Sequence, residues 1–172
     1  MLIMSDGIVS DIAVMILIVI LVLVGPIYQN FETADRLMSS MVTEIINNYQ
    51  KEIRKSGYID QETYLNLLND LCVTGEVYEV KMVHTSRLVY PSTTTSDEYE
   101  IHEVKYGQDL ILDTIKDGTT KYTMRYGDNF KIEVKETKVP PSRLLSNIFH
   151  GSGKETLMSY PSGGMVENEV YE

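Results

Sequence analysis

The longest apolar run in the chain lies near its N-terminus. Every residue from Ile12 to Val24 is apolar, and no charge occurs between Asp11 and Glu32. The uncharged run over 12–31 has the length of roughly 20 residues that a helix needs to cross a bilayer. The pattern therefore predicts a membrane-spanning helix. A cleaved secretory signal is the alternative, although no basic residue precedes the run and no small-residue cleavage site follows it.

A Gly25-Pro26 pair interrupts this run. Proline in a helix interior lacks a backbone donor and clashes with the preceding turn, so we expect a kink or a locally melted turn. Beyond the pair, apolar residues recur at spacings of three and four, which predicts a long amphipathic helix reaching Ser56, with Gly57 as its C-terminal cap. Its distal part is expected to pack on the chain's own sheet. The stripe comprises Ile27, Phe31, Ala34, Leu37, Met38, Met41, Val42, Ile45, Ile46, Tyr49 and Ile53.

Asp11, at the N-terminal edge of the apolar run, has two interpretations. Its carboxylate accepts hydrogen bonds from first-turn N–H groups and meets the positive end of the helix dipole. Alternatively, it pairs at the membrane edge with a positive charge of a neighbouring subunit, such as a free processed N-terminus. An unpaired carboxylate in lipid would cost several kcal/mol, so the second interpretation requires such a partner.

A second helix and several strands are predicted in the rest of the chain. Asp60 is a candidate N-cap before "QETYLNLLNDL", and Gly75 ends that helix. "EVYEVKMVH" alternates apolar and charged residues, which predicts a half-buried strand continuing to Tyr90. "YEIHEVK" and "TLMSYP" predict further strands and "PSTTTSDE" a polar loop. "GQDLILDTIKDG" is expected to form a short helix or an irregular crossing segment, and "SRLLSNIF" a helical turn or two.

The strongest local turn signal is Gly127-Asp128. It lies between "KYTMRY" and "NFKIEVKE", which both alternate, and it predicts a two-residue hairpin. Tyr122, Met124 and Tyr126 are then expected to share one face beside the apolar residues of the second strand. An antiparallel sheet follows from this pairing.

Together these elements predict an α+β fold in which the long N-terminal helix, a membrane span continuing into an amphipathic helix, packs on a small antiparallel β-sheet. The expected segments are a hydrophobic membrane and assembly helix over 1–26, its amphipathic continuation over 27–57, an α+β body over 58–162 and a flexible acidic tail over 163–172.

The length, net charge and cysteine content of the chain limit its domain count and the classes of partner it can bind. The chain has 172 residues, room for one ordinary domain plus an appended segment. Its net charge of −10 disfavours nucleic acid or an anionic membrane surface as a partner of the soluble part. Cys72 is the only cysteine and cannot form an intramolecular disulfide. It follows Leu71 in an apolar helical pattern, so we interpret it as a small buried hydrophobe.

No familiar catalytic or metal-binding pattern occurs in the sequence. His84, His102 and His150 lack metal-site spacing, although His84 and His102 could meet across strands. "HGSGKE" lacks the full phosphate-loop pattern, and "YPSGGM" is not a nucleophile elbow. The acidic turns "KDGTT" and "YGDNF" lack the ligand spacing of a calcium loop. The sequence therefore predicts a non-enzymatic protein without cofactor or metal.

The stretch "SDGIVSDIAVMILIVILVLVGPIYQNFETADRLMSSMVTEI" resembles type IV pilins and pseudopilins. It looks most like TadE-like minor pilins and related pilin-like proteins of tight-adherence and secretion systems in Gram-positive bacteria. "GYIDQETYLNLLNDLCVTGEVYEV" and "YGDNFKIEV" are similar to pilin-like Firmicutes proteins. The resemblance implies a structural subunit of a surface filament, pilus or pseudopilus. Such a subunit is a single-pass membrane protein with an extracellular body, and its partners are lipid, copies of itself or other pilin-like subunits, a prepilin peptidase and an assembly platform.

The resemblance also implies a processing site and a set of assembly contacts. A prepilin peptidase cut after Gly7 would leave Ile8 first and Asp11 fourth. The family carries glutamate one position later, and here no Lys or Arg precedes Gly7, so an unprocessed N-terminus is the alternative. The implied assembly contacts are Asp11, Gly25, Pro26, Phe31, Met38, Met41 and Ile45.

Two alternatives remain for the side of the membrane on which the body lies, and two for whether the chain polymerises. The basic residue nearest the span is Arg36, which the positive-inside bias, taken literally, would place in the cytoplasm together with the body. The pilin resemblance places the body outside. The alternative function is a single-span membrane-anchored interaction module, or a secretion-complex component, that does not polymerise.

Overall fold

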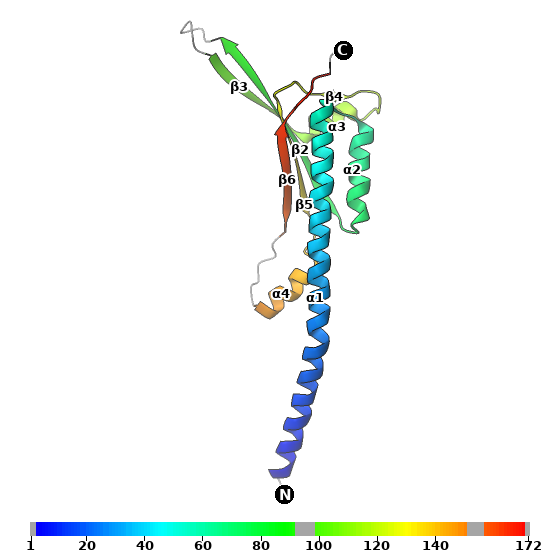
Figure 1. The fold of residues 1–172 in the computed structure, drawn as a ribbon, viewed down its shortest axis with the longest axis vertical. Coiled ribbons are helices and arrows are strands. Elements are labelled where there is room, and N and C mark those ends of the chain that lie inside the picture. The colour runs from blue at the N-terminus through cyan, green and yellow to red at the C-terminus, as the bar shows by residue number, and fades with distance from the viewer. Residues whose placement is uncertain (1–2, 92–98, 151–156, 171–172) are drawn as a thin grey trace. The chain divides into compact units, whose positions relative to one another are not determined.

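The computed structural model describes residues 3–91, 99–150 and 157–170 (Figure 1). The chain divides into two compact units, unit 1 over 1–38 and 139–155, and unit 2 over 39–138 and 156–172. The described elements confirm the predicted α+β class, with a long apolar N-terminal helix and antiparallel sheets. The helices are α1 (Ile3–Ser56), α2 (Gln61–Val73), α3 (Gln108–Ile115) and α4 (Pro141–His150).

Helix α1 supplies residues 3–38 to unit 1 and residues 39–56 to unit 2. It is assigned as one α-helix of 54 residues that includes Pro26, so the expected locally melted turn is wrong. Proline removes a single N–H donor, and the helical hydrogen bonds on either side keep the backbone in place. The predicted C-terminus is confirmed, because Gly57 adopts a φ of 75° and its N–H donates to the Ile53 carbonyl at 2.9 Å.

Unit 2 contains a four-stranded antiparallel sheet in the order β3-β2-β5-β6 and a two-stranded sheet of β1 and β4. β2 and β3 confirm the predicted strands, and β2 pairs with β3 on one side and β5 on the other. The expected loop "PSTTTSDE" falls on residues that, Pro91 apart, lie outside the described part of the chain. The strands are β1 (Tyr58–Ile59), β2 (Tyr78–Pro91), β3 (Tyr99–Tyr106), β4 (Tyr122–Thr123), β5 (Asn129–Glu136) and β6 (Ser159–Met165).

The expected hairpin across Gly127-Asp128 is wrong. β4 pairs with β1, and β5 pairs with β2 and β6. β5 finds longer partners on both of its edges, and the Asp128 side chain is buried. As a result Tyr126 is 65% exposed, whereas Tyr122 and Met124 are buried as predicted.

The core of unit 2 joins the distal part of α1 to the sheet and to α2 and α3, as predicted for that part of the stripe. Asp60 caps α2 as predicted, because its Oδ1 accepts from the Thr63 N–H at 2.9 Å. Cys72 is exposed, so its interpretation as a buried hydrophobe is wrong. It follows Leu71, and one residue turns a helix by about 100°, enough to leave the core face. The core comprises Val42, Ile46, Ile53, Ile59, Leu67, Leu71, Val80, Met82, Ile111, Ile115, Tyr122, Met124, Phe130, Ile132, Val134 and Val166.

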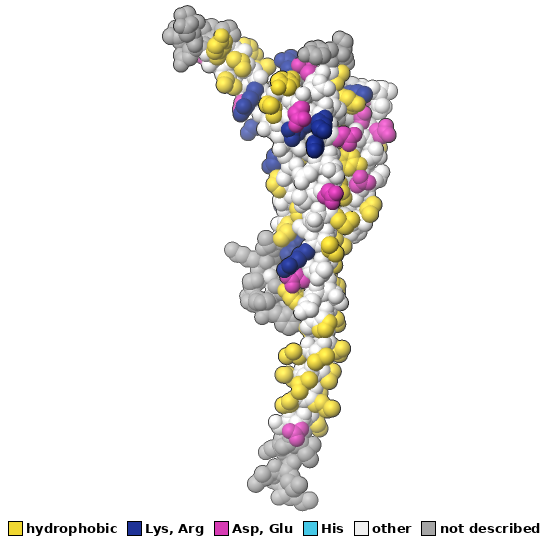
Figure 2. Space-filling view, viewed as in Figure 1, with side chains coloured by type: hydrophobic (Ala, Val, Ile, Leu, Met, Phe, Trp, Pro, Cys, Tyr) yellow, Lys and Arg dark blue, Asp and Glu magenta, His cyan; other side chains and the backbone are white. Residues whose placement is uncertain are grey.

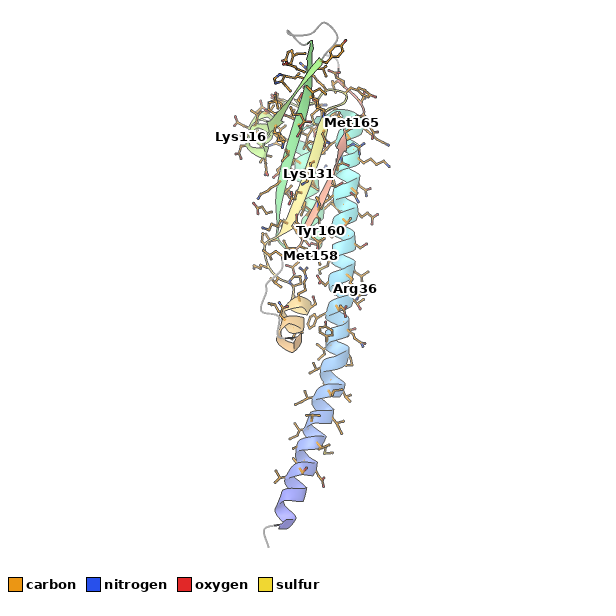
Figure 3. The ribbon with its side chains drawn as sticks, turned by 90° about the vertical axis from the view of Figure 1, so that its left-hand side faces the viewer. Arg36, Lys116, Lys131, Met158, Tyr160 and Met165 are labelled. Carbon is orange, nitrogen blue, oxygen red and sulfur yellow. The ribbon has the colours of Figure 1, made fainter. Side chains whose placement is uncertain are left out.

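Strand β6 lies along the part of α1 that belongs to unit 2 (Figure 3). Ser39 and Arg54 of that helix contact Tyr160 Oη at 3.1 Å and the Met165 carbonyl at 2.6 Å, respectively. β6 runs to Met165 and Val166 is fully buried, so the flexible tail predicted from residue 163 begins too early. The strand also starts at Ser159, later than the expected "TLMSYP". Pairing with β5 and contact with α1 order residues whose glycines suggested a loose tail.

Candidate functional site

The N-terminal part of α1 exposes apolar side chains on every side of the helix. Each large apolar side chain from Val9 to Leu23 is more than half exposed. Figure 2 shows hydrophobic side chains, in yellow, along the N-terminal part of α1. A helix of a soluble protein buries an apolar stripe, whereas this segment buries none of its apolar window. Among the described residues, α1 is the helix long and apolar enough to cross a membrane.

The energetic consequence of this exposure is large. Full burial of a Val, Leu or Ile side chain is worth about 1.5–3 kcal/mol, and the segment carries such residues in nearly every position from Ile16 to Leu23. A contiguous apolar surface of this kind marks a site for lipid or for other proteins. The isolated chain provides no cover for it in the described structure.

The structure corrects one interpretation of Asp11. α1 begins at Ile3, so Asp11 lies more than two turns inside the helix and does not cap it. The side chain is exposed. Gly7 and Ile8, the implied processing site, also lie within α1. A helix that began at Ile8 would instead place Asp11 in its first turn, where its charge meets the helix dipole.

The remaining implied assembly contacts lie on α1 but differ in exposure. Gly25 and Pro26 are exposed, and apart from the adjacent residues and the helix's own backbone no atom lies within 4 Å of a Cβ built on Gly25. Phe31 and Met41 are 41% and 46% exposed. Met38 and Ile45 are half-buried, and Ile45 packs against the core of unit 2. The structure therefore leaves the residues before the core-packing part of the stripe available for contact.

A polar contact holds α4 to α1 within unit 1. Arg143 donates from Nε to Asp35 Oδ2 at 3.2 Å and from Nη2 to Oδ1 at 3.3 Å. Ser142 Oγ also donates to Asp35 Oδ2 at 3.1 Å. Both charged side chains are only about one-fifth exposed, at 18% and 19%. We call these three residues the α4 clasp. Two-point Arg–carboxylate geometry in a partly dry setting makes this contact stronger than an ordinary surface ion pair.

The sequence interpretation missed the α4 clasp. Asp35 lies near the start of the amphipathic part of α1, where an acidic residue is ordinary. Its partner lies 108 positions away, and no local pattern links the two. The only sequence signal is an arginine close behind Pro141, at a position where proline starts a helix.

A buried polar cluster in unit 2 was also missed. His84 Nε2 lies 2.9 Å from Asp128 Oδ2, and His84 Nδ1 lies 2.8 Å from the Tyr122 hydroxyl. Asp128 also accepts from the backbone N–H groups of Arg87 and Arg125 at 3.2 and 3.1 Å. Burial, together with the nearby Tyr106 and Asp128, raises the pKa of Tyr122 to about 12, so its hydroxyl keeps its proton at neutral pH.

The cluster pins segments together rather than presenting a reactive group. His84 bonds Asp128 through one ring nitrogen and the Tyr122 hydroxyl through the other, so each of the three side chains has a partner. All three are buried, with exposures of 4%, 3% and 9% for His84, Asp128 and Tyr122. The signal was present in the sequence, because the alternation of Tyr78, Val80 and Met82 continues to His84 and predicts that it faces the core.

The suggested meeting of His84 and His102 does not occur. The register of β2 and β3 places His84 opposite Tyr106, and His102 opposite Leu88. The His102 ring instead packs edge-on against Tyr90. Within residues 3–91, 99–150 and 157–170, no group of three or more His, Cys, Asp or Glu side chains is arranged to hold a metal ion.

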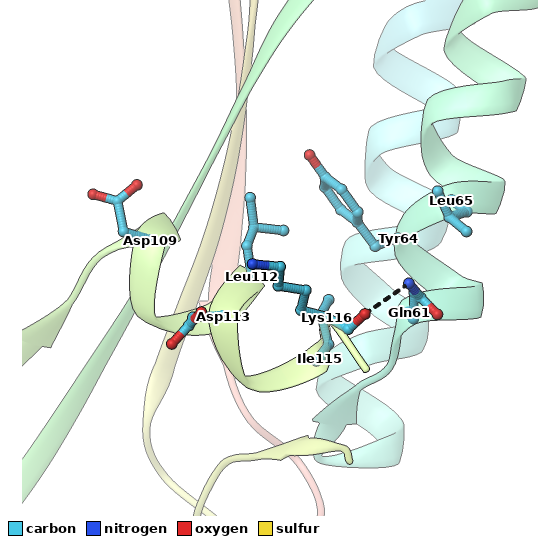
Figure 4. Close-up of a pocket in the computed structure, with 8 residues that line it drawn as sticks. All are labelled: Gln61, Tyr64, Leu65, Asp109, Leu112, Asp113, Ile115 and Lys116. Carbon is cyan, nitrogen blue, oxygen red and sulfur yellow. Dashed lines mark hydrogen bonds between the residues drawn. The ribbon is translucent and has the colours of Figure 1, made fainter. Parts of the chain in front are cut away.

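A shallow recess of about 400 Å³ lies between α2 and α3 in unit 2 (Figure 4). Leu65 of α2 and Leu112 of α3 line it, together with the α3 carboxylates of Asp109 and Asp113. Gln61 spans one end by donating from Nε2 to the Lys116 carbonyl at 3.2 Å. The lining residues offer no pairing of a nucleophile with a base, so the recess has no evident catalytic chemistry.

No protein-family model, curated protein or solved structure matched the chain. The isolated chain does not bury the apolar surface that α1 exposes before residue 28.

Proposed function

We propose that the chain is a single-span, pilin-like structural subunit that assembles through its N-terminal helix into a surface filament, pilus or pseudopilus. The observation that carries the proposal is an apolar surface exposed on all sides of α1 from Val9 to Leu23, continuous with a helix that packs into the core of unit 2. One helix thus joins the apolar segment to the folded body.

The same surface serves two states of the subunit. In the membrane, lipid covers it. In a filament, the corresponding helices of neighbouring copies cover it, and close packing replaces the lipid contacts. The β-rich unit 2 then lies outside the cell and makes the lateral contacts between subunits.

Asp11 gains a role in this proposal as a pairing group. An exposed carboxylate inside an apolar helix costs several kcal/mol in lipid unless it is paired. Cleavage after Gly7 would create a free amino group at Ile8, and the amino group of a neighbouring copy is a fitting partner. A prepilin peptidase and an assembly platform are the machinery that this route requires.

The proposal is tested by replacing residues 8–26 with an unrelated transmembrane helix of equal length in the full-length chain. Because a generic apolar helix keeps the anchor but not the packing surface, we expect membrane insertion to persist and filaments in the surface-sheared fraction to disappear. Immunodetection of the sheared and membrane fractions measures both. Filaments that persist after the exchange would contradict assembly through this helix.

A second candidate is an anchored interaction module that does not polymerise. The ribbon formed by β2 and β3 beyond Thr85 favours it, because β2 loses its pairing with β5 there. Val89 and Ile101 face each other across this ribbon and are 60% and 65% exposed. This candidate predicts that the helix exchange leaves function intact.

A further inference from the structure

The α4 clasp fixes the height of α4 along α1. The apolar segment of α1 ends where charges begin, at Glu32, and Asp35 follows three residues later. Three residues of helix correspond to about 4.5 Å along the axis. The polar headgroup layer on each side of a bilayer is about 5–8 Å thick, so Asp35 falls within that layer when the apolar segment spans the hydrocarbon core.

The sequence of α4 suits this depth. "PSRLLSNIFH" has no acidic residue, and its apolar residues fall in two adjacent pairs four positions apart, the spacing of one helix side. Leu144 is 43% exposed, and Leu145 is half-buried. Helices with an apolar side, a polar side and basic rather than acidic charge lie in the plane of the membrane interface.

We propose that α4 is an interfacial helix. Its apolar side inserts at the boundary between headgroups and acyl chains, and the α4 clasp sets how deep the span of α1 sits in the bilayer. The partner is the lipid surface, because Asp35, which holds α4, lies just beyond the uncharged run over 12–31 that ends at Glu32. The inference rests on the proposed function only in that this segment crosses the membrane.

The chain contains no tryptophan, so single tryptophans report depth without background. Full-length variants L17W, L144W and V73W are reconstituted in phosphatidylcholine vesicles whose lipids carry bromine either near the headgroups or near the bilayer centre. Bromine quenches tryptophan emission only at close range. Leu17 lies in the apolar segment, and Val73 of α2 is 76% exposed in unit 2.

The expected pattern separates three depths. L17W loses more emission to deep bromine, V73W loses little to either, and L144W loses about twofold more emission to shallow than to deep bromine. If L144W emits as in water and is not quenched while L17W is, the inference about α4 is wrong and the span stands. Stronger quenching of L144W by deep bromine also overturns the interfacial position. If L17W itself escapes quenching, the span on which the proposed function rests is wrong.

A matched pair of acid-to-amide changes tests the clasp in the L144W background. D35N keeps the side-chain size but removes the charge that pairs with Arg143, and shallow quenching of L144W should fall towards the V73W level. E32Q removes a charge one turn earlier, where Glu32 pairs with Arg36 of the same helix, labelled in Figure 3. Quenching should stay unchanged in E32Q. Equal quenching in both variants would overturn the role of the clasp.

Discussion

Single residues hold distant segments of unit 2 together, and Asp128 is the clearest case. Its carboxylate accepts from His84 and from the backbone N–H groups of Arg87 and Arg125. These donors come from β2 and from the connection between β4 and β5. A buried carboxylate with several donors stabilises the fold only while the whole set is present, because each donor left behind is desolvated without a partner.

Asp128→Ala should therefore lower the free energy of unfolding by about 3 kcal/mol. The measure is urea denaturation of the full-length protein in mild detergent, followed by circular dichroism. Asp109→Asn is the matched control, since Asp109 is exposed at the rim of the α2–α3 recess, and a change within about 0.5 kcal/mol is expected. Equal stability of the Asp128 variant and the wild type would show that the cluster pins nothing.

Sequence reasoning reached some of these residues and missed others for a physical reason. Asp60 was predicted correctly because an N-cap is read from its own neighbourhood. Asp128 was predicted as a turn residue, and its partner His84 lies 44 positions away. Asp35 and Arg143 are separated by 108 positions. Contacts of this range depend on how the elements pack, which local patterns do not encode.

At the scale of elements, α1 shows which sequence patterns predicted the structure correctly. The period of its apolar stripe predicted a helix to Ser56, and the structure confirms that end. Gly25-Pro26 was overrated as a break, because the neighbouring hydrogen bonds outweigh one missing donor. The hairpin at Gly127-Asp128 was predicted from turn residues alone, and competition between strand partners decided the pairing instead.

Gly57, at the C-terminal cap of α1, should not tolerate alanine. Gly57 has a φ of 75°, and a Cβ there would collide with the backbone carbonyl oxygen of Asn168. Gly57→Ala should lower the free energy of unfolding by at least about 1–2 kcal/mol. Denaturation of this variant and the wild type in the same detergent measures the change, and a stabilising Gly57→Ala would contradict the left-handed cap.

At the scale of the whole molecule, the chain separates a helix segment that is exposed all round from a body that buries its own core. The sequence predicted this division, because an uninterrupted apolar run needs an external partner and a periodic stripe needs a core on one side. It could not predict that α4 returns to the first unit, since that contact forms through the α4 clasp. The division into an exposed helix and a self-sufficient body is what supports a subunit that assembles by its helix.

The most direct test of this account is cross-linking of α1 between copies in intact cells. Cys72→Ser removes the only cysteine, which is exposed, and Leu17→Cys then places a single thiol in the apolar segment. A short thiol-reactive cross-linker should give a ladder of oligomers beyond the dimer in the surface-sheared fraction, and the cysteine-free parent should give none. Only monomers at Leu17→Cys, in protein shown to be inserted in the membrane, would contradict assembly through the helix.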